Sequence, residues 1–306
     1  MRALPVGALV GAIDFGGTKT AMALIDRDGR IGPRLRIATP ERPEPAAMCD
    51  LLAQQWQVLL QQAGGQAVDR VGVAAPGPAD ADAGILHQAF DWPWHEVPLA
   101  ADLSMRLGLP VRLDNDVNCC CRAELRFGAA RQARDFAWIQ LSTGVGGALC
   151  CGGRIYAGAH GTAGEVGHLI LEEDGPPCRC GRRGCLQALV SGPAIARRYG
   201  EAGGVAPPGA EAVFVAASAG EARARDVLLG VARDLGRGIA MVVNLLGPEM
   251  IVLGGGVLQS FAPYLPAVRA AVQDRVIGER NRQVAIVQSG VGYDAALLGA
   301  AALAQE

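Results

Sequence analysis

Short apolar runs and amphipathic stretches alternate along most of this chain. Residues 8–14 (Ala-Leu-Val-Gly-Ala-Ile-Asp) are apolar and end in an acid, which predicts a buried strand, and residues 21–25 predict a second strand after a short turn. Residues 46–63 carry apolar positions at helical spacing and predict an amphipathic helix. The same criteria predict further strands and helices at residues 71–75, 99–107, 138–141, 148–151, 191–199, 222–246 and 250–253, and from residue 295 onward. This mixture indicates an α/β protein.

Glycine-rich turns follow three of the predicted strands, at residues 16–18, 143–147 and 254–256. In α/β folds, ligands bind just beyond the ends of the strands. One turn lies in the first half of the chain and two lie in the second half, which suggests two related α/β halves facing a cleft. No close sequence repeat supports a duplication, so this prediction rests on the arrangement alone.

Composition narrows the classes of protein that fit this pattern. The chain has 306 residues, half of them hydrophobic, and a formal net charge of −2. That length allows two domains, and the near-neutral charge gives no support for a nucleic-acid or anionic-membrane partner. No apolar run is long enough to span a bilayer. Residues 1–13 lead directly into a motif without a cleavage site, so we expect a first strand rather than a signal peptide, and a cytoplasmic protein.

One histidine and three cysteines near the middle of the chain have the spacing of a metal site. His168, Cys178, Cys180 and Cys185 supply one imidazole and three thiols, a complete tetrahedral set for zinc. Four protein ligands leave no position for water, so the predicted role of the ion is structural. Disulfides are the weaker alternative, because the nine cysteines are an odd number and no signal peptide is visible.

The first glycine-rich turn follows Asp14 and ends at Lys19. Its small residues Gly16, Gly17 and Thr18 allow backbone N–H groups to approach phosphate oxygens, and Asp14 could hold magnesium directly or through water. Lys19 is the only lysine among 28 basic residues, which suggests that a compact point charge is needed there. A simple hairpin turn and chance retention of the lysine are the alternatives.

The other two turns offer further anion contacts. Thr143 and Gly144 begin a second nest of backbone N–H groups. Gly254, Gly255 and Gly256 form a third site of close approach, suited to the flat or phosphate parts of a nucleotide. The three turns together predict a nucleotide site more strongly than any one of them does.

Asp116 is the candidate catalytic base. It follows a predicted strand at residues 111–113, and an aspartate at that point can accept the proton of a substrate hydroxyl as the hydroxyl attacks a phosphoryl group. The N-cap of a helix is the commoner use of aspartate at such a place, so on spacing alone both interpretations stay open.

Seven motifs occur in order from about residue 8 to the end of the chain. They are Asp14-Phe15-Gly16-Gly17-Thr18-Lys19, Pro76-Gly77-Pro78, Asn115-Asp116, Ser142-Thr143-Gly144-Val145-Gly146-Gly147, Gly164-Glu165-Val166-Gly167-His168, the Cys-x-Cys-Gly-x-x-Gly-Cys run and Gly254-Gly255-Gly256. Together they resemble the motifs of ROK-family sugar kinases (repressors, open reading frames, kinases). The Glu-x-Gly-His motif with the cysteine run is highly specific, and the turn motifs are less so.

The resemblance implies an α/β, actin-like and ribonuclease-H-like fold with two α/β domains flanking a nucleotide and sugar cleft. We expect a smaller N-terminal domain at residues 1–116 and a larger domain at residues 117–292, with the zinc-binding segment at residues 168–185. A C-terminal helix at about residues 293–306 is expected to pack back on the first domain.

Site residues follow from the resemblance position by position. Asp116 resembles the family's catalytic base, which takes the proton from the sugar hydroxyl, usually on C6. Asn115, Glu165 and His168 resemble sugar-binding residues, with Gly77 lining the pocket. The resemblance also implies nucleotide and magnesium contacts from Asp14, Gly16, Gly17, Thr18, Lys19, Thr143, Gly144, Gly254, Gly255 and Gly256.

Two departures from the family pattern concern the sugar. The family commonly has Glu two residues after the last zinc cysteine, where it touches the sugar ring, and this chain has Gln187. An amide still bonds a hydroxyl, but it donates as well as accepts and carries no charge. A second sugar contact of the family falls near Trp92 and Trp94, which we expect to be core residues rather than surfaces for sugar stacking.

The expected function is therefore that of an ATP-dependent hexose kinase with glucose as substrate, Mg²⁺ and structural Zn²⁺ as cofactors, and a homodimeric assembly. Kinases of N-acetylmannosamine, N-acetylglucosamine and fructose are close alternatives, and polyphosphate is an alternative donor. A sugar-sensing repressor fits less well, because only 13 residues precede Asp14 and they carry no basic patch. A catalytically silent sugar-binding paralogue stays open because of Gln187.

Overall fold

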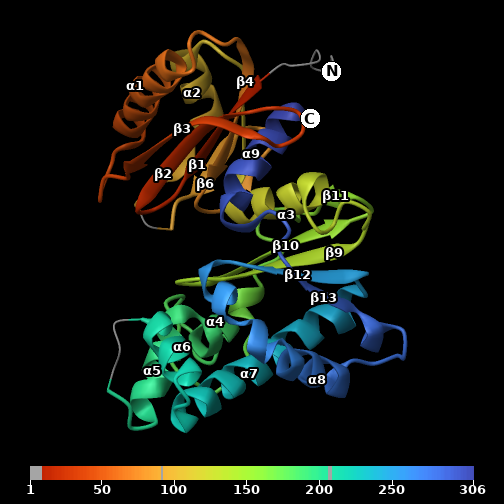
Figure 1. Cartoon of the computed structure of the whole chain (residues 1–306). Coiled ribbons are helices and arrows are strands. Elements are labelled where there is room, and N and C mark those ends of the chain that lie inside the picture. The colour runs from red at the N-terminus through yellow and green to blue at the C-terminus, as the bar shows by residue number, and fades with distance from the viewer. Residues whose placement is uncertain (1–8, 91, 206–208) are drawn as a thin grey trace. The chain divides into compact units, whose positions relative to one another are not determined.

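The computed structural model describes residues 9–90, 92–205 and 209–306, so Ala8 of the first expected strand lies outside the described residues. The chain forms two compact units, each with its own five-stranded sheet (Figure 1). Unit 1 comprises the chain up to Gln132, Ile155–Ala163 and Tyr293–Glu306, and unit 2 comprises Ala133–Arg154 and Gly164–Gly292. The expected domain boundary after residue 116 stays a prediction.

The sheet of unit 1 combines a hairpin edge with parallel strands. Its order is β3-β2-β1-β4-β8. The first three strands in the chain, β1 (Leu9–Phe15), β2 (Lys19–Ile25) and β3 (Ile31–Ala38), pair antiparallel. β1 then pairs parallel with β4 (Val68–Ala75), which pairs parallel with β8 (Val111–Asn115). The carboxyl ends of β1, β4 and β8 therefore lie along one edge of the sheet.

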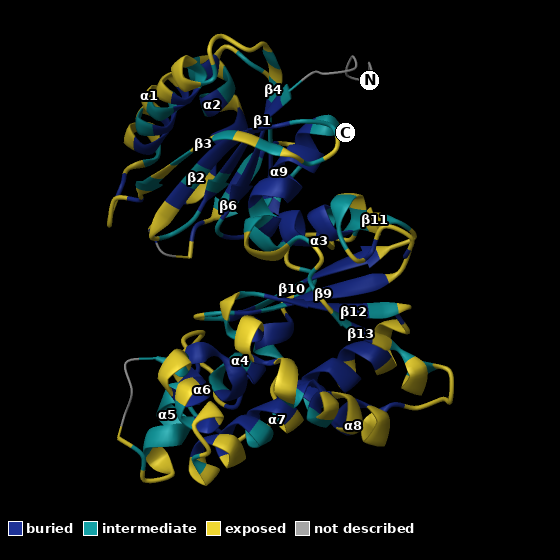
Figure 2. Cartoon of the chain, viewed as in Figure 1, coloured by how far each residue is buried: buried dark blue, intermediate teal, exposed yellow. Residues whose placement is uncertain are grey.

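Helices cover both faces of this sheet. α1 (Pro45–Gln62) and α2 (Leu99–Leu107) lie on one face, where a Cβ at Gly11 of β1 would stand 2.2 Å from the ring of Trp56 in α1. α3 (Asp116–Phe127) and α9 (Ala295–Gln305) lie on the other, where a Cβ at Gly72 of β4 would stand 1.8 Å from the carbonyl oxygen of Ala300. Figure 2 shows α9 buried along nearly its whole length.

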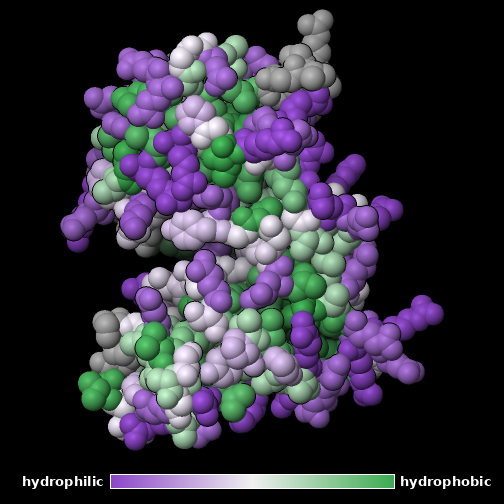
Figure 3. Space-filling model, viewed as in Figure 1, coloured by the Kyte–Doolittle hydropathy of each residue, from purple (hydrophilic) through white to green (hydrophobic). Residues whose placement is uncertain are grey.

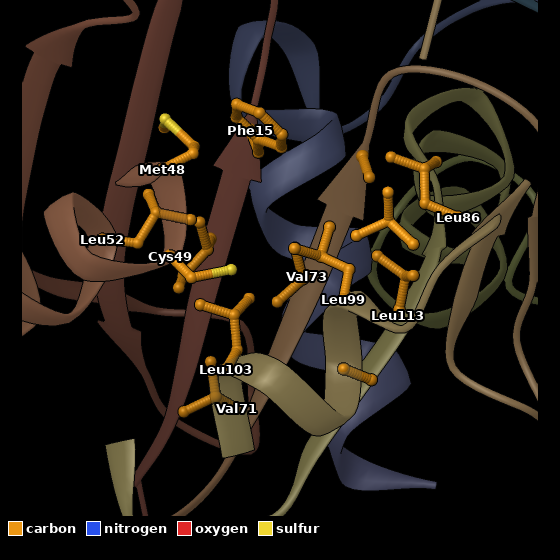
Figure 4. Close-up of a cluster of buried hydrophobic side chains, with 14 of the residues drawn as sticks. Phe15, Met48, Cys49, Leu52, Val71, Val73, Leu86, Leu99, Leu103 and Leu113 are labelled. Atoms are coloured by element: carbon orange, nitrogen blue, oxygen red, sulfur yellow. The ribbon is translucent and has the colours of Figure 1, made fainter. Parts of the chain in front are cut away.

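The core of unit 1 lies between the sheet and the α1–α2 layer (Figure 4). Phe15, at the end of β1, stacks on Trp92 with ring centroids 5.0 Å apart, and Trp94 packs beside both. The two indole N–H groups donate to the carbonyls of Glu41 and Pro43 at 3.1 and 2.8 Å. Trp92 and Trp94 are 5% and 3% exposed, so the prediction that they are core residues is confirmed.

A small three-stranded antiparallel sheet completes unit 1. It consists of β5 (Ala79–Asp80), β6 (Ile85–Gln88) and β7 (His95–Val97) in that order. These strands have two to four residues, which is too short for an alternating pattern to be recognised in the sequence.

The sheet of unit 2 repeats the arrangement of the sheet in unit 1. Its order is β11-β10-β9-β12-β13, with β9 (Phe136–Leu141) and β10 (Val145–Cys151) antiparallel and with β12 (Met250–Gly254) parallel to its two neighbours. β11 (Arg154–Ile155) and β13 (Ala285–Gln288) form the edges. A hairpin edge followed by parallel strands thus occurs in both sheets, as the spacing of the glycine-rich turns suggested.

Five helices gather on one side of this second sheet (Figure 1). They are α4 (Leu186–Val190), α5 (Gly192–Glu201), α6 (Ala210–Ser218), α7 (Ala222–Leu246) and α8 (Leu265–Arg275). Short 3₁₀ helices occur at Val166–His168, Gly256–Ser260, Ala262–Tyr264, Asn281–Gln283 and Gly292–Asp294. The helices expected at residues 191–199 and 222–246 are confirmed.

The surface carries no single dominant patch on the face drawn in Figure 3, where hydrophilic and hydrophobic side chains are interspersed. Among residues 9–90, 92–205 and 209–306, no helix combines the length and the apolar character that crossing a bilayer requires.

Candidate active site

Asn115 and Asp116 lie where β8 passes into α3. Asn115 is the N-cap of α3, because its Oδ1 accepts from the backbone N–H groups of Val117 and Asn118 at 2.9 and 3.1 Å. Its Nδ2 donates to Oδ1 of Asp116 at 3.0 Å, and the same oxygen accepts from the Val117 N–H at 2.9 Å. The capping role therefore belongs to Asn115, and Asp116 is held in the first helical turn as a fixed, half-buried carboxylate.

Gly77 is tied to this carboxylate through Asn115. Nδ2 of Asn115 also donates to the carbonyl oxygen of Gly77 at 3.1 Å. Gly77 has a φ of +139°, and a Cβ there would stand 2.0 Å from the carbonyl oxygen of Gln88, so only glycine fits. The amide of Asn115 thus joins the turn after β4 to the start of α3.

Behind this turn lies a charged network that the sequence analysis did not identify. Asp114 is 2% exposed; its Oδ1 accepts from Nδ2 of Asn118 and its Oδ2 from Arg122 Nη2, both at 2.9 Å. Arg122 also pairs with Glu306 at the end of α9. A buried acid beside an arginine eight residues later gives no recognisable signal before the fold is known. The two ion pairs of Arg122 together fix the end of β8 against α3 and the end of α9.

Asp14 is the last residue but one of β1, and its surroundings raise its pKa. Loss of solvent, together with the negative charges of Asp116 and Asp294, raises the pKa of Asp14 to about 7, although the positive charge of Arg36 opposes the shift. Asp294 itself pairs with Arg34 and Arg36 of β3 at 3.2 and 3.3 Å. Two carboxylates in mutual range, one of them desolvated, are the chemistry of a site that a divalent cation would neutralise.

The first glycine-rich turn is pinned by Thr39 just after β3. The hydroxyl of Thr39 donates to the carbonyl oxygen of Gly16 at 2.8 Å, and its N–H donates to the carbonyl of Thr18 at 3.0 Å. Gly17 lies between these two anchors, and Lys19 begins β2 with an exposed side chain. Two hydrogen bonds from Thr39 thus hold the turn in place, and the charge of Lys19 lies at its exposed end.

A cavity in unit 2 lies beside the second and third turns. Its volume is about 760 Å³, within the usual range for small-molecule sites. Thr143 and Gly256 line it. Gly255, directly before Gly256, has a φ of +97°, and a Cβ added there would stand only 2.2 Å from the carbonyl oxygen of Leu141. Gly144 and Gly254 neighbour these residues in the two turns. The remaining lining residues are Ser142, Gly192, Pro193, Ala196, Gly209, Ala210, Glu211, Phe214, Val257, Gln259 and Ser260.

The walls from α5 and α6 were not anticipated from the sequence. Gly192 N–H donates to the carbonyl of Ser142 at 2.9 Å, which docks the start of α5 on the second turn. Ser191 caps α5, its Oγ accepting from the N–H of Ala194 at 3.4 Å. The Ser-Gly-Pro sequence that starts α5 signals a helix N-terminus, but nothing in it signals a cavity.

The four predicted metal ligands converge in unit 2. One ligand atom each from His168, Cys178, Cys180 and Cys185 can be chosen so that all lie within 4.8 Å of one another. Cys180 Sγ lies 3.7 Å from Cys185 Sγ, and Cys178 Sγ lies 3.8 Å from Nδ1 of His168. Ligands of a tetrahedral zinc with Zn–S bonds of about 2.3 Å lie about 3.8 Å apart, whereas a disulfide needs about 2.05 Å. The cluster therefore fits a tetrahedral ion and no disulfide.

The thiols of this cluster are unlike one another. Burial opposes ionisation of Cys178, but hydrogen bonds from the Cys180 backbone and from Gln187 outweigh it and lower the pKa of Cys178 to about 6. Burial and the neighbouring sulfur atoms raise the pKa of Cys185 to about 12. A thiolate at Cys178 is the form that binds a metal ion.

Glu165 directly precedes the short 3₁₀ helix Val166–His168, and His168 is the last residue of that helix. His168 turns Nδ1 toward the sulfur atoms and Nε2 toward Glu165, whose Oε2 lies 3.9 Å away. The side chains are 45% and 30% exposed, so both can reach a ligand from solvent. Gln187, on α4, points its amide at the metal cluster and donates to Sγ of Cys178 at 3.1 Å.

Comparisons with known proteins cover nearly the whole chain. A model of the ROK family matches residues 10–306. A glucokinase of Thermotoga maritima is 31% identical over 317 aligned residues, 99% of each chain. An N-acetylmannosamine kinase of Salmonella heidelberg is 34% identical over 299 aligned residues, 96% of this chain and 97% of that protein.

Among solved structures, a ROK family glucokinase from Streptomyces griseus in complex with glucose and AMPPNP matches with a TM-score of 0.83 and 29% identity. The match covers 97% of this chain and 99% of that chain. The predicted α/β fold of the actin-like, ribonuclease-H-like type is thereby confirmed.

Proposed function

This chain belongs to the ROK family, and from that membership we propose that it is an ATP-dependent hexose kinase that phosphorylates the 6-hydroxyl of glucose. The observation that carries the proposal is the geometry of Asp116. Its carboxylate accepts hydrogen bonds from Asn115 Nδ2 and the Val117 N–H at the start of α3, and the N-cap of that helix is Asn115. A positioned carboxylate is what the attack of a sugar hydroxyl on the γ-phosphoryl group requires.

In the proposed reaction, Asp116 accepts the proton of the 6-hydroxyl as that oxygen attacks the γ-phosphorus and ADP leaves. The backbone N–H groups of the turns at residues 16–18, 143–144 and 254–256 stabilise the phosphate charge, with Lys19 as a point charge at the rim of its turn. Mg²⁺ bound near Asp14 would neutralise charge on the phosphates. The raised pKa of Asp14 fits this role, because a cation favours its ionised form.

ATP is proposed to bind in unit 2, in the cavity of about 760 Å³ beside Thr143 and Gly256. Its volume suits a nucleoside, and the two turns at its rim suit the phosphates. Gly144, Gly254 and Gly255 complete these turns. The AMPPNP named with the Streptomyces griseus structure supports a nucleotide as donor.

Glu165, His168, Gly77, Asn115 and Asp116 are proposed as sugar contacts, because each matches a sugar-binding position of the family motifs. Carboxylates accept hydrogen bonds from sugar hydroxyls, and the imidazole and amide groups add donors to the set. Gln187 is a further candidate, since its carbonyl oxygen has a second lone pair. N-Acetylmannosamine is the second candidate substrate, because the Salmonella heidelberg relative is a kinase of that sugar.

We further propose that His168, Cys178, Cys180 and Cys185 hold a structural zinc ion, because the donor set and the 3.7 and 3.8 Å separations fit one. The zinc would fix the loop that carries Glu165 and orient the imidazole of His168. The proposal includes a homodimer and a cytoplasmic location, where ATP is available and thiols stay reduced.

The proposal is tested by measuring ADP release from ATP and Mg²⁺ with glucose, mannose, fructose, N-acetylglucosamine and N-acetylmannosamine. We expect turnover with glucose and a loss of kcat of at least a thousandfold in Asp116→Asn, with sugar affinity retained. Asp69→Asn, an exposed acid in the same unit, should leave turnover unchanged. Polyphosphate in place of ATP tests the alternative donor.

Sugar binding without turnover by any donor would overturn the proposal and favour the silent sugar-binding alternative. An unaffected rate in Asp116→Asn would remove Asp116 from its proposed role.

A further inference from the structure

Gln187 occupies a position between the metal cluster and the second glycine-rich turn. It is the second residue of α4 and follows the last cysteine ligand, Cys185, by two positions. One end of its amide donates from Nε2 to Sγ of Cys178 at 3.1 Å. A donor that bonds a ligand atom from outside the ligand set is the kind of contact that orients metal ligands.

The other end of the same amide faces the turn. Oε1 accepts from the N–H of Val145 at 3.5 Å, a long hydrogen bond. A Cβ placed on Gly144 would lie 3.3 Å from that oxygen, so the amide rests directly against the backbone of the turn. The donor end of the Gln187 amide therefore contacts the metal cluster, and its acceptor end contacts the second glycine-rich turn.

We propose that Gln187 is a positioning residue that joins the metal centre to the turn at residues 142–145. Through it, binding of the metal by Cys178 orders the turn, and the turn in its ordered form favours the loaded metal site. The further consequence, that metal loading supports nucleotide binding, rests on the function proposed above.

The amide suits this place better than the carboxylate that the family commonly has. A carboxylate can accept from Val145 but has no proton to donate to sulfur, and it would place a negative charge beside a thiolate. An amide supplies the donor and the acceptor together without a charge. The departure at position 187 is thereby explained as an adaptation to the metal cluster and not only to the sugar.

Two variants of the full-length protein separate the two contacts. Gln187→Leu keeps the size and removes both contacts, whereas Gln187→Glu keeps an oxygen toward Val145 and removes the donor to sulfur. Gln273→Leu, on the exposed side of α8 in the same unit, is the matched control. All three proteins are first checked for the wild-type far-UV spectrum and melting cooperativity.

The first readout is zinc affinity, measured by competition with a chromophoric chelator. Loss of an outer-shell partner typically weakens metal binding by about tenfold or more. We therefore expect about tenfold weaker binding in Gln187→Leu, at least as much weakening in Gln187→Glu, and wild-type affinity in Gln273→Leu.

The second readout is backbone hydrogen exchange of the segment at residues 142–147 with the metal site saturated. Removing the contact to Val145 should speed exchange there by about fivefold in Gln187→Leu. Gln187→Glu, which keeps the acceptor, should stay near the wild-type rate. Exchange in β9, outside the turn, should not differ among the variants.

Zinc affinity within twofold of wild type in both position-187 variants would overturn the link to Cys178. Unchanged exchange in Gln187→Leu would overturn the link to the turn. Neither readout depends on kinase activity, so an inactive protein would refute the proposed function while leaving these two results decisive for Gln187.

Discussion

At the scale of single residues, the two candidate site acids of unit 1, Asp14 and Asp116, differ in how they are held. Asp116 is fixed by Asn115 and a helix N–H, while burial and the charge of Asp116 raise the pKa of Asp14 to about 7. Near neutral pH a proton would therefore compete with the proposed cation for Asp14. The apoprotein bears a cost for ionising Asp14 that a bound Mg²⁺ would remove.

That cost predicts a pH-dependent effect of Asp14→Asn on stability. The pKa of Asp14 is raised on folding, so the native state binds more protons than the unfolded state, and stability falls as the pH rises from about 4 to about 7. In magnesium-free buffer, Asp14→Asn should therefore melt higher than wild type by a margin that is larger at pH 8 than at pH 5. Differential scanning calorimetry at both pH values measures the margin.

Asp69→Asn is the control for this measurement, because it removes an acid from the surface of the same unit. Its margin over wild type should be small at both pH values. A margin for Asp14→Asn that is equal at pH 5 and pH 8, or larger at pH 5, would contradict the raised pKa.

At the scale of elements, close helix packing in unit 1 depends on one glycine in α9. A Cβ on Gly299 would stand 1.7 Å from the carbonyl oxygen of Cys119 in α3, a backbone atom that cannot move aside alone. Gly299→Ala should thus destabilise unit 1 by about 3 kcal/mol, at the upper end of the usual cost of overpacking. Urea denaturation followed by circular dichroism measures the change.

Gly230→Ala in α7 is the matched control. Its added Cβ would meet Nη2 of Arg198 at 2.7 Å, the end of a long side chain rather than a backbone atom, and alanine favours a helix over glycine by about 1 kcal/mol. The control should be neutral or more stable than wild type. Equal effects of the two substitutions would show that α3 and α9 do not depend on this close approach.

The elements also show where sequence patterns are informative. α2 and α7 end where the sequence predicted, at Leu107 and Leu246, because amphipathic helices carry their own periodic signal. β3 went unpredicted because it contains Pro33 and alternates only between half-buried and exposed residues at the edge of its sheet. α8 went unpredicted because it begins Leu-Pro directly after a 3₁₀ turn.

The candidate site divides in the same way between local and distant contacts. His168 and the three cysteines lie within 18 residues of one another, so their spacing alone indicated a ligand set. The Asp114–Arg122–Glu306 network and the cavity walls from α5 and α6 depend on residues that meet only after folding. The contacts of Gln187 likewise required the structure, since its amide could equally have faced a sugar.

At the scale of the whole molecule, the two units share a sheet topology, and each has its own buried apolar core. The segment 164–187 of unit 2 differs from both cores, because it has mostly turns, a short 3₁₀ helix and the four candidate metal ligands. Such a segment has little apolar surface to bury, so the proposed ion would supply its order. Removal of the metal should therefore affect the two units unequally.

Removal of the proposed metal should lower the melting temperature of unit 2 far more than that of unit 1. A structural metal present at a thousand times its dissociation constant stabilises the folded form by about 4 kcal/mol. Each kcal/mol moves the melting temperature of a unit of about 150 residues by about 3 °C. Chelation under reducing conditions should thus lower the melting transition of unit 2 by about 12 °C and leave that of unit 1 nearly unchanged.

Hydrogen exchange along a temperature series assigns each transition to its unit, and added Zn²⁺ should restore the upper value, whereas added Mg²⁺ should not. Cys151→Ser is the control, because it removes an exposed thiol of unit 2 outside the ligand set. If both units shifted together, the metal would stabilise the whole molecule through contacts beyond its own segment. If neither shifted, the four ligands would hold their geometry without an ion, and the structural role of zinc would be wrong.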